Sequence, residues 1–200
     1  MIKIVAGEYK GRLLKAPKNI RPILAQIKKS VFDILTPYIE GSVFLDLYAG
    51  SGAVGLEALS RQANFCVFVE KEKNCLRVLS ENVIKLGCQS SCYIIKADIL
   101  KELIWVEKAK RILKEKFSRE DFDIIFVGAP YVEKEETKKF LLKNFSLPTI
   151  DIIFNSTLLN KNGILVVQHH KKESIQQYNH FCFKQKKYGD TLVSFFKFNL

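Results

Sequence analysis

The segment Asp46-Leu47-Tyr48-Ala49-Gly50-Ser51-Gly52-Ala53-Val54-Gly55 decides the predicted fold. It places Gly-x-Gly-x-x-Gly directly after an apolar, strand-like run at 43–48 and at the start of a helix-like stretch at 53–61. Glycines there let the chain turn sharply and let a ligand approach the backbone with no Cβ in the way. The pattern alone also fits an ordinary tight turn. Glu70, which ends the next strand 18 residues after Gly52, suits the hydroxyls of a ribose and favours a nucleoside cofactor.

On both sides of this loop, apolar residues alternate between strand-like and helix-like spacing. Because the strands are apolar on both faces and separated by helices, we predict a parallel sheet covered on both sides. Two further strands around Tyr188-Gly189-Asp190 predict a C-terminal antiparallel hairpin, where a nicotinamide-binding domain would end in a sixth parallel strand. The parallel strands are predicted at 43–48, 65–69, 93–95, 122–127 and 164–167, the hairpin strands at 181–183 and 192–198, and the helices at 53–61, 72–86, 99–117, 133–145 and 150–159.

The N-terminal forty residues form a separate basic extension. A hairpin is predicted around residues 7–11, followed by a helix from Pro22 to Leu35 that ends at Pro37. The predicted fold is therefore α/β and Rossmann-like, with a mostly parallel seven-stranded sheet, a C-terminal antiparallel hairpin and a small N-terminal hairpin and helix. We expect one domain over 1–200, with the extension at 1–40 and the cofactor-binding core at 41–200.

Composition narrows the class of protein. The 200 residues are 48% hydrophobic and 26% charged, which is typical of a globular domain. No apolar run approaches the roughly 18 residues that span a bilayer, and the first residues are too polar for a signal peptide, so we expect a cytoplasmic protein. The five cysteines are scattered and the three histidines lack ligand spacing. We therefore expect free thiols and no metal site.

The net charge of +11 indicates a polyanionic partner, most commonly nucleic acid. Residues 1–40 hold eight basic residues against three acids, so the positive charge is concentrated in the extension. A solvated face is the alternative explanation. The candidate phosphate contacts are Lys10, Arg12, Arg21, Lys28 and Lys29.

Three acids favour S-adenosylmethionine over a dinucleotide as the cofactor. This cofactor has no pyrophosphate for the helix N-terminus; it carries a cationic amine and sulfonium, and an adenine whose amino group needs an acceptor. Asp46 either orders the loop or faces the amine, Glu70 suits the ribose, and Asp98 suits the adenine, unless Asp98 caps a helix that begins at Ile99. The candidate cofactor-binding residues are Asp46, Tyr48, Gly50, Ser51, Gly52, Glu70, Lys71, Asp98 and Ile99.

The sequence resembles the RsmD-type small-subunit rRNA guanine-N2 methyltransferases over nearly its whole length. The most specific match is the loop with its continuation, Tyr48 to Arg61, followed by Glu70. Further matches are Ile4 to Gly7, Gly11 to Leu14, Ile20 to Pro22, Val31 to Leu35, and Lys187 to Thr191. The resemblance implies that the chain, expected to be a monomer, methylates the exocyclic amine of one guanine in 16S rRNA of the small ribosomal subunit.

In that family an Asp/Asn-Pro-Pro-Tyr/Phe motif after the fourth strand binds and orients the target base. The corresponding residues here are Gly128, Ala129, Pro130 and Tyr131, so the acid is absent and only backbone carbonyls remain as acceptors. Ile23, Ala25 and Lys29 also replace a Thr, an Asp and a Glu of the family pattern.

Several interpretations follow from these departures. The chain is an active enzyme that relies on backbone carbonyls, a homologue that binds cofactor and RNA without efficient transfer, or an N-methyltransferase with another target. An RNA-binding protein on a decayed fold is the non-enzymatic alternative, although the retained loop and Glu70 favour catalysis. Gln168, at the end of the fifth strand, is either a minor site residue or a strand-end cap.

Overall fold

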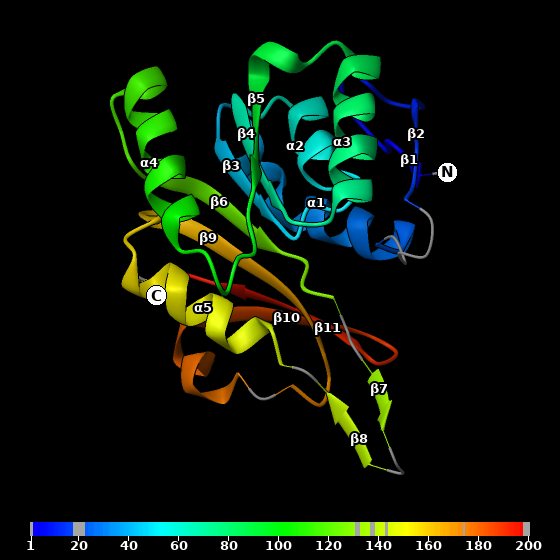
Figure 1. Ribbon diagram of the computed structural model, residues 1–200, viewed down its shortest axis with the longest axis vertical. Helices are drawn as coiled ribbons and strands as arrows, with labels where there is room; N and C mark the ends of the chain where they lie inside the picture. Colours follow the sequence, from blue (N-terminus) through cyan, green and yellow to red (C-terminus); the bar gives the residue numbers. More distant parts are fainter. Residues whose placement is uncertain are drawn as a thin grey trace.

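The computed structural model describes residues 2–17, 23–130, 133–136, 139–142, 144–173 and 175–197, and side chains between 131 and 143 are left out of the description. A seven-stranded sheet forms its centre (Figure 1). Five strands are parallel, and β11 and β10 follow antiparallel at one edge, in the order β10-β11-β9-β6-β3-β4-β5. The strands are β3 (Val43–Leu47), β4 (Phe65–Glu70), β5 (Cys92–Lys96), β6 (Phe122–Val127), β9 (Leu159–His170), β10 (Cys182–Tyr188) and β11 (Thr191–Phe196). The predicted fold class is confirmed.

Helices cover both faces of this sheet, and each face has its own hydrophobic core. On one face lie α1 (Ala25–Ile39), α2 (Gly55–Ser60) and α3 (Lys73–Leu86); on the other lie α4 (Ile104–Phe117) and α5 (Ser146–Asn155) (Figure 1). Alternate residues of each central strand contact opposite cores, as in β3, where Phe44 faces the first core and Leu45 the second. This arrangement explains the unbroken apolar runs in the sequence.

Several element boundaries differ from the prediction. β9 extends well beyond the predicted 164–167 because its second half pairs with β11 from Leu165 to His170, which continues the ladder. α4 begins at Ile104, five residues later than expected, and α5 occupies 146–155 rather than 150–159. The predicted helix start at Pro22 lies outside the described residues.

The prediction that Pro37 ends the first helix was wrong. α1 continues to Ile39 with Pro37 inside its last turn. Ile39 is buried in the core, and the Thr36 hydroxyl donates to the Phe32 carbonyl at 2.8 Å. Burial at the end of the helix therefore outweighs the hydrogen bond that a proline removes.

The predicted helix at 133–145 was also wrong. Residues Glu133–Glu136 (β7) and Lys139–Leu142 (β8) form an antiparallel pair. The stretch from 133 to 139 contains no apolar residue, so a helix there would have no stripe to bury against the core. The helix propensity of Glu and Lys alone, a few tenths of a kcal/mol per residue, does not decide such a segment.

The N-terminal hairpin is present as β1 (Ile2–Lys3) paired antiparallel with β2 (Leu13–Leu14). The turn between them packs on α2, where Gly7, at φ +82°, approaches so closely that a Cβ would lie 1.6 Å from the Ser60 carbonyl oxygen. Only glycine fits this contact. Among the described residues, no helix is long and apolar enough to cross a membrane.

Candidate active site

The carboxyl ends of the parallel strands meet at one edge of the sheet. Leu47 pairs with Val69 on one side and with Val127 on the other, and Val127 pairs in turn with Val167. The backbone N–H of Gly128 donates to the Leu47 carbonyl at 3.2 Å. The glycine loop and the segments that follow β4, β5, β6 and β9 therefore lie together, at the edge where α/β proteins bind ligands.

The glycine loop turns through backbone angles that side chains disfavour. The φ angle is +60° at Tyr48, +56° at Gly50 and +77° at Gly52. A Cβ on Gly52 would also lie 2.4 Å from Leu79 Cδ1 of α3. Both the angle and the space therefore require glycine at position 52.

Asp46 holds the glycine loop through a buried hydrogen bond. It is buried, and its Oδ2 accepts a hydrogen bond from the Gly55 N–H at 2.9 Å. Burial raises the pKa of Asp46 to about 8; the Gly55 hydrogen bond opposes this shift and the Glu70 charge adds to it. Of the two roles predicted for Asp46, the contact with Gly55 corresponds to the ordering of the loop.

Glu70 ties the end of β4 to the same loop. Its Oε2 accepts from the Gly50 N–H at 2.8 Å, and its Oε1 accepts from the N–H groups of Lys71 and Glu72 at 2.7 and 2.9 Å. These contacts hold the carboxylate in one orientation at the edge of the sheet. A ribose contact remains a prediction, because each carboxylate oxygen retains acceptor capacity.

Asp98 follows β5 and does not cap a helix, since α4 begins at Ile104. Its Oδ1 accepts from the Leu100 N–H at 3.3 Å, and its Oδ2 lies 3.3 Å from Lys71 Nζ. Partial burial acts to raise the pKa of Asp98, but the bonds from Lys71 and Leu100 and the nearby lysine charges hold it below its ordinary value. The neighbouring Ile99 is buried. The adenine role of this segment stays a prediction.

The Tyr48 side chain joins the loop to α5. Its hydroxyl lies 2.8 Å from Thr149 Oγ1, and its ring meets Phe145 edge to face with centroids 6.3 Å apart. Burial raises the pKa of the Tyr48 hydroxyl to about 12, against the Thr149 hydrogen bond and with contributions from the charges of Asp98, Glu173 and Glu70. Thr149 was not predicted as a site residue. The only feature of the sequence that indicates it is a polar residue within a largely apolar helix.

Asn82 on α3 is a second residue that was not predicted to belong to the site. Its Nδ2 donates to the carbonyls of Ser51 and Lys15 at 2.9 and 3.0 Å, and its Oδ1 accepts from the Lys15 N–H at 2.8 Å. In the sequence, the only indication was an asparagine directly before the apolar Val83, which the structure shows to be buried. Asn82 therefore connects the glycine loop with the chain that follows the N-terminal hairpin.

The segment after β6 carries the altered motif. Gly128 is half-buried, Ala129 is buried and Pro130 is exposed, while Tyr131 lies outside the described residues. The atoms nearest to a Cβ added at Gly128 belong to the Phe126 ring, at 3.0 Å. A Cβ at 128 thus requires a movement of that ring by a few tenths of an ångström.

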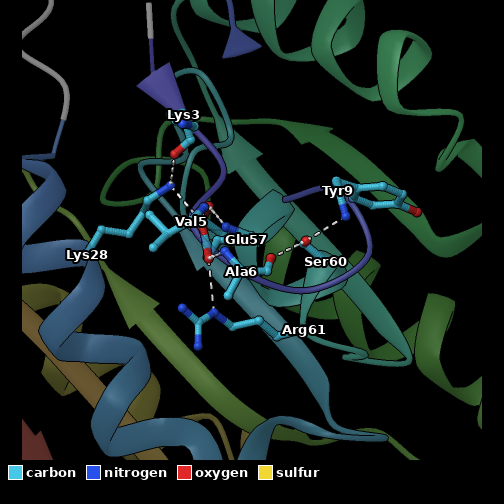
Figure 2. A network of polar contacts seen from close by, with 10 residues as sticks. Lys3, Val5, Ala6, Tyr9, Lys28, Glu57, Ser60 and Arg61 are labelled. Carbon is cyan, nitrogen blue, oxygen red and sulfur yellow. Dashed lines mark hydrogen bonds and ion pairs between the residues drawn. The ribbon is translucent and has the colours of Figure 1, made fainter. Parts of the chain in front are cut away.

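The N-terminal extension is anchored to α2 through Glu57 and Ser60 (Figure 2). The Glu57 carboxylate is fully buried and accepts from the N–H groups of Val5 and Ala6 at 2.8 and 3.0 Å and from Arg61 Nε at 3.0 Å. Ser60 Oγ accepts from the Tyr9 N–H at 2.9 Å and donates to the Ala6 carbonyl at 2.5 Å. The helix that begins at the glycine loop therefore also holds the basic extension.

The prediction that Lys28 contacts phosphate is not supported. Its side chain is 1% exposed, with Nζ 2.8 Å from Glu57 Oε2 and donating to the Lys3 carbonyl at 2.8 Å (Figure 2). A buried ammonium takes a buried partner because desolvation is costly. Glu57 was not predicted as the buried partner of Lys28, because by sequence alone a charged residue inside Gly-Leu-Glu-Ala-Leu cannot be told from a surface acid.

The other basic candidates have different surroundings. Lys10 and Arg12 are exposed beside the N-terminal turn. Lys29 is exposed and lies 2.9 Å from Asp33 one helical turn away. Arg21 lies outside the described residues. Phosphate contact by these four residues remains a prediction.

A family model described as Conserved hypothetical protein 95 matches residues 2–197. The chain is 32% identical over 176 residues to ribosomal RNA small subunit methyltransferase D of Buchnera aphidicola, a match that covers 87% of this chain and 81% of that protein.

Two solved structures show the same fold. A hypothetical protein of Thermus thermophilus superposes with a TM-score of 0.77 at 26% identity, covering 98% of this chain and 99% of the other. An RNA methyltransferase from Salinibacter ruber, solved with S-adenosyl-L-homocysteine, has a TM-score of 0.62 at 11% identity and covers 90% and 96% of the two chains. The fold is that of the class I methyltransferases, as predicted. This chain belongs to the family described as Conserved hypothetical protein 95, which includes ribosomal RNA small subunit methyltransferase D, and the resemblance seen in its sequence is confirmed.

Proposed function

We propose that this chain transfers the methyl group of S-adenosylmethionine to the exocyclic N2 of a guanine in 16S rRNA of the small ribosomal subunit. The observation that carries the proposal is the hydrogen bond from Gly128 to Leu47, which sets segment 128–130 directly beside the glycine loop. A methyl donor at the loop and an amine at Gly128 would be neighbours at one edge of the sheet. The name of the Buchnera relative supports ribosomal RNA as the substrate class.

The residues present fit this cofactor. The loop gives the backbone close approach, Glu70 offers carboxylate oxygens for the ribose, and Asp98 lies at the next strand end for the adenine. Bound there, the cofactor supplies an electrophilic methyl group on a sulfonium. The protein lowers the barrier mainly by holding the amine in line with that methyl.

The target amine needs help from the protein. The lone pair of a guanine amine is delocalised into the ring, so the enzyme must orient the amine and accept its proton. The base must also leave its stack and lie against an aromatic or apolar wall, a role proposed for Pro130 and Tyr131. The carbonyls of Gly128 and Ala129 are proposed to orient the amine.

We assign substrate docking to the basic extension. Lys10 and Arg12 are exposed beside the turn that packs on α2, and Lys29 is exposed on α1. Together with Arg21 they are proposed to contact phosphates, which makes binding sensitive to salt. The anchoring of the extension by Glu57 would place these contacts in a constant position relative to the site.

A second candidate function follows from the missing acid. With Gly128 in place of the Asp or Asn of the family motif, the chain would bind cofactor and RNA without efficient transfer. The fold and the loop support both candidates equally. They differ only in turnover.

The deciding experiment is transfer of labelled methyl from S-adenosylmethionine to small subunits that lack N2-methylguanosine, followed by nucleoside digestion. Label in N2-methylguanosine supports the enzyme. Cofactor binding in the same preparation without label supports the silent homologue, and label in another nucleoside indicates another target. Glu107→Gln, at an exposed acid on α4, is the matched control for preparation quality.

A further inference from the structure

Three buried polar atoms at the substrate end of the site lack partners. Among the described residues, the buried side-chain N and O atoms without a hydrogen bond are Ser146 Oγ, Gln168 Oε1 and Glu173 Oε2. Leaving such an atom without a partner costs free energy, because its lost hydration is not replaced. Unsatisfied buried groups are uncommon in proteins, and a catalytic role is one of the explanations for them.

All three atoms belong to segments around the carboxyl ends of β6 and β9. Val127 pairs with Val167, so Gln168 is next to Gly128 across the ladder. Glu173 is in the turn that follows β9, and Ser146 opens α5 one turn before Thr149, the partner of Tyr48. They therefore share the edge that holds the altered motif.

Glu173 is held in a fixed orientation. It is 8% exposed, its N–H donates to the His170 carbonyl at 2.9 Å, and its Oε1 accepts from the His170 N–H at 3.2 Å. These two bonds fix one oxygen of the carboxylate and leave Oε2 without a partner. The Glu173 charge also contributes to the raised pKa of the Tyr48 hydroxyl.

The other acids at this edge are already engaged. Both oxygens of Glu70 accept backbone bonds, Asp46 accepts from Gly55, and Asp98 is paired with Lys71. Gln168 and Ser146 are neutral and cannot take a proton at neutral pH. Within the described part of the chain, Glu173 is the only carboxylate with a buried oxygen that has no hydrogen-bond partner.

We propose that Glu173 is a catalytic residue whose Oε2 accepts the N2–H of the target guanine and takes its proton, in place of the acid absent at Gly128. The N2–C bond forms as the S–C bond of the sulfonium breaks, which leaves a neutral thioether and a guanine whose methylated N2 is positively charged and keeps both of its protons. The proton then passes from N2 to Glu173 Oε2 and on to solvent. This inference rests on the proposed function.

The test compares Glu173→Gln with the parent, with Gly128→Asp and with the double variant. Glutamine keeps the acceptor for the His170 N–H but cannot take a proton. We expect kcat on small subunits to fall about 100-fold in Glu173→Gln, within the range for general-base loss. Cofactor affinity by titration calorimetry should stay unchanged. Glu107→Gln, an exposed acid on α4, is the control and should keep parental activity.

A further readout separates a catalytic role from a structural one. Gly128→Asp should raise kcat by a larger factor in the Glu173→Gln background than in the parent, because only there is the acceptor missing.

The outcomes distinguish this inference from the proposed function. Parental activity in Glu173→Gln would overturn the inference alone, as would loss of cofactor affinity in parallel with rate. An inactive parent with an active Gly128→Asp variant would also overturn it, while keeping the family chemistry. If neither transfers methyl to guanine N2, the proposed function fails and the inference fails with it.

Discussion

The two halves of the site are built differently. On the loop side, formed by residues 46–61 and Glu70, the buried polar groups are paired, and Asp46, Glu57, Ser60 and Glu70 all bond to backbone N–H groups. On the substrate side, formed by residues 128–130, Ser146, Gln168 and Glu173, three buried polar atoms are unpaired. A region that is satisfied without ligand is preorganised, whereas a region with free donors and acceptors depends on its ligand for partners. The following changes test this contrast.

The largest effect is expected from Glu57→Ala, which removes the central partner of the loop side. Lys28 would stay buried with its charge unpaired, and the N–H groups of Val5 and Ala6 would lose their acceptor. We expect the free energy of unfolding to fall by about 3–5 kcal/mol, measured by urea denaturation. Asp33→Ala, which removes the exposed partner of Lys29, is the control and should change it by less than about 1 kcal/mol. Equal losses in both variants would contradict the role of Glu57.

Gly52→Ala should abolish the preorganisation of the loop. The added Cβ meets Leu79 Cδ1 at 2.4 Å at a φ of +77°. We expect affinity for S-adenosylmethionine, measured by calorimetry, to fall about 100-fold, which corresponds to about 2.7 kcal/mol. Gly41→Ala is matched in backbone angle, at +71°, but has nothing within 4 Å of its Cβ. If both variants bind equally well, the loop geometry does not control affinity.

Gly128→Asp acts on the substrate side, where the parent lacks an acid. The nearest neighbour of the added Cβ is the Phe126 ring, at 3.0 Å and not backbone, so we expect the variant to fold. We expect turnover in the labelled-methyl assay to rise by up to about tenfold, because a carboxylate accepts a hydrogen bond better than a carbonyl does. An unchanged or lower rate would count against an acceptor role at position 128. Cofactor affinity should not change.

The smallest effect is expected from Asp46→Asn, and it is measured as a change in how Tm depends on pH. The pKa of Asp46 is raised from 3.8 to about 8 in the folded protein, so the folded state keeps a proton that the unfolded state has lost. The contribution of Asp46 to the free energy of unfolding is therefore fully present below about pH 4 and is lost as the pH rises toward 8. The asparagine side chain keeps an acceptor for the Gly55 N–H and cannot ionise, so the Tm of the variant should fall less between about pH 5 and 9. A parallel decline in both proteins would exclude Asp46 as the cause.

The loop side was largely predictable from sequence, whereas on the substrate side the sequence indicated residues 128–130 and Gln168 but neither Ser146 nor Glu173. Glycine spacing and the acid that ends β4 are local patterns, so they indicated the loop and Glu70 directly. Glu173 becomes part of the edge only through the pairing of β6 with β9, which brings together segments about forty residues apart. The register between β6 and β9 cannot be read from the spacing of residues in the sequence. The same limit applies to Lys28, whose burial depends on Glu57 of another helix.

The paired strands β7 and β8 show a different limit. Their Glu- and Lys-rich segment has high helix propensity, yet it has no apolar stripe to place against the sheet. Propensity predicted a helix where packing offered no support for one.

The anchoring of the N-terminal turn on α2 has a consequence for biosynthesis. Val5, Ala6 and Tyr9 bond to Glu57 and Ser60 across 51–52 residues of chain. During translation at about 5–20 residues per second, the turn is made about 3–10 s before its anchor exists. The extension proposed to dock on RNA is thus made before the helix that fixes it. A chain released before α2 would carry the positive charge of the extension without its fixed shape, so folding order itself delays a defined RNA-docking surface until the cofactor loop has been made.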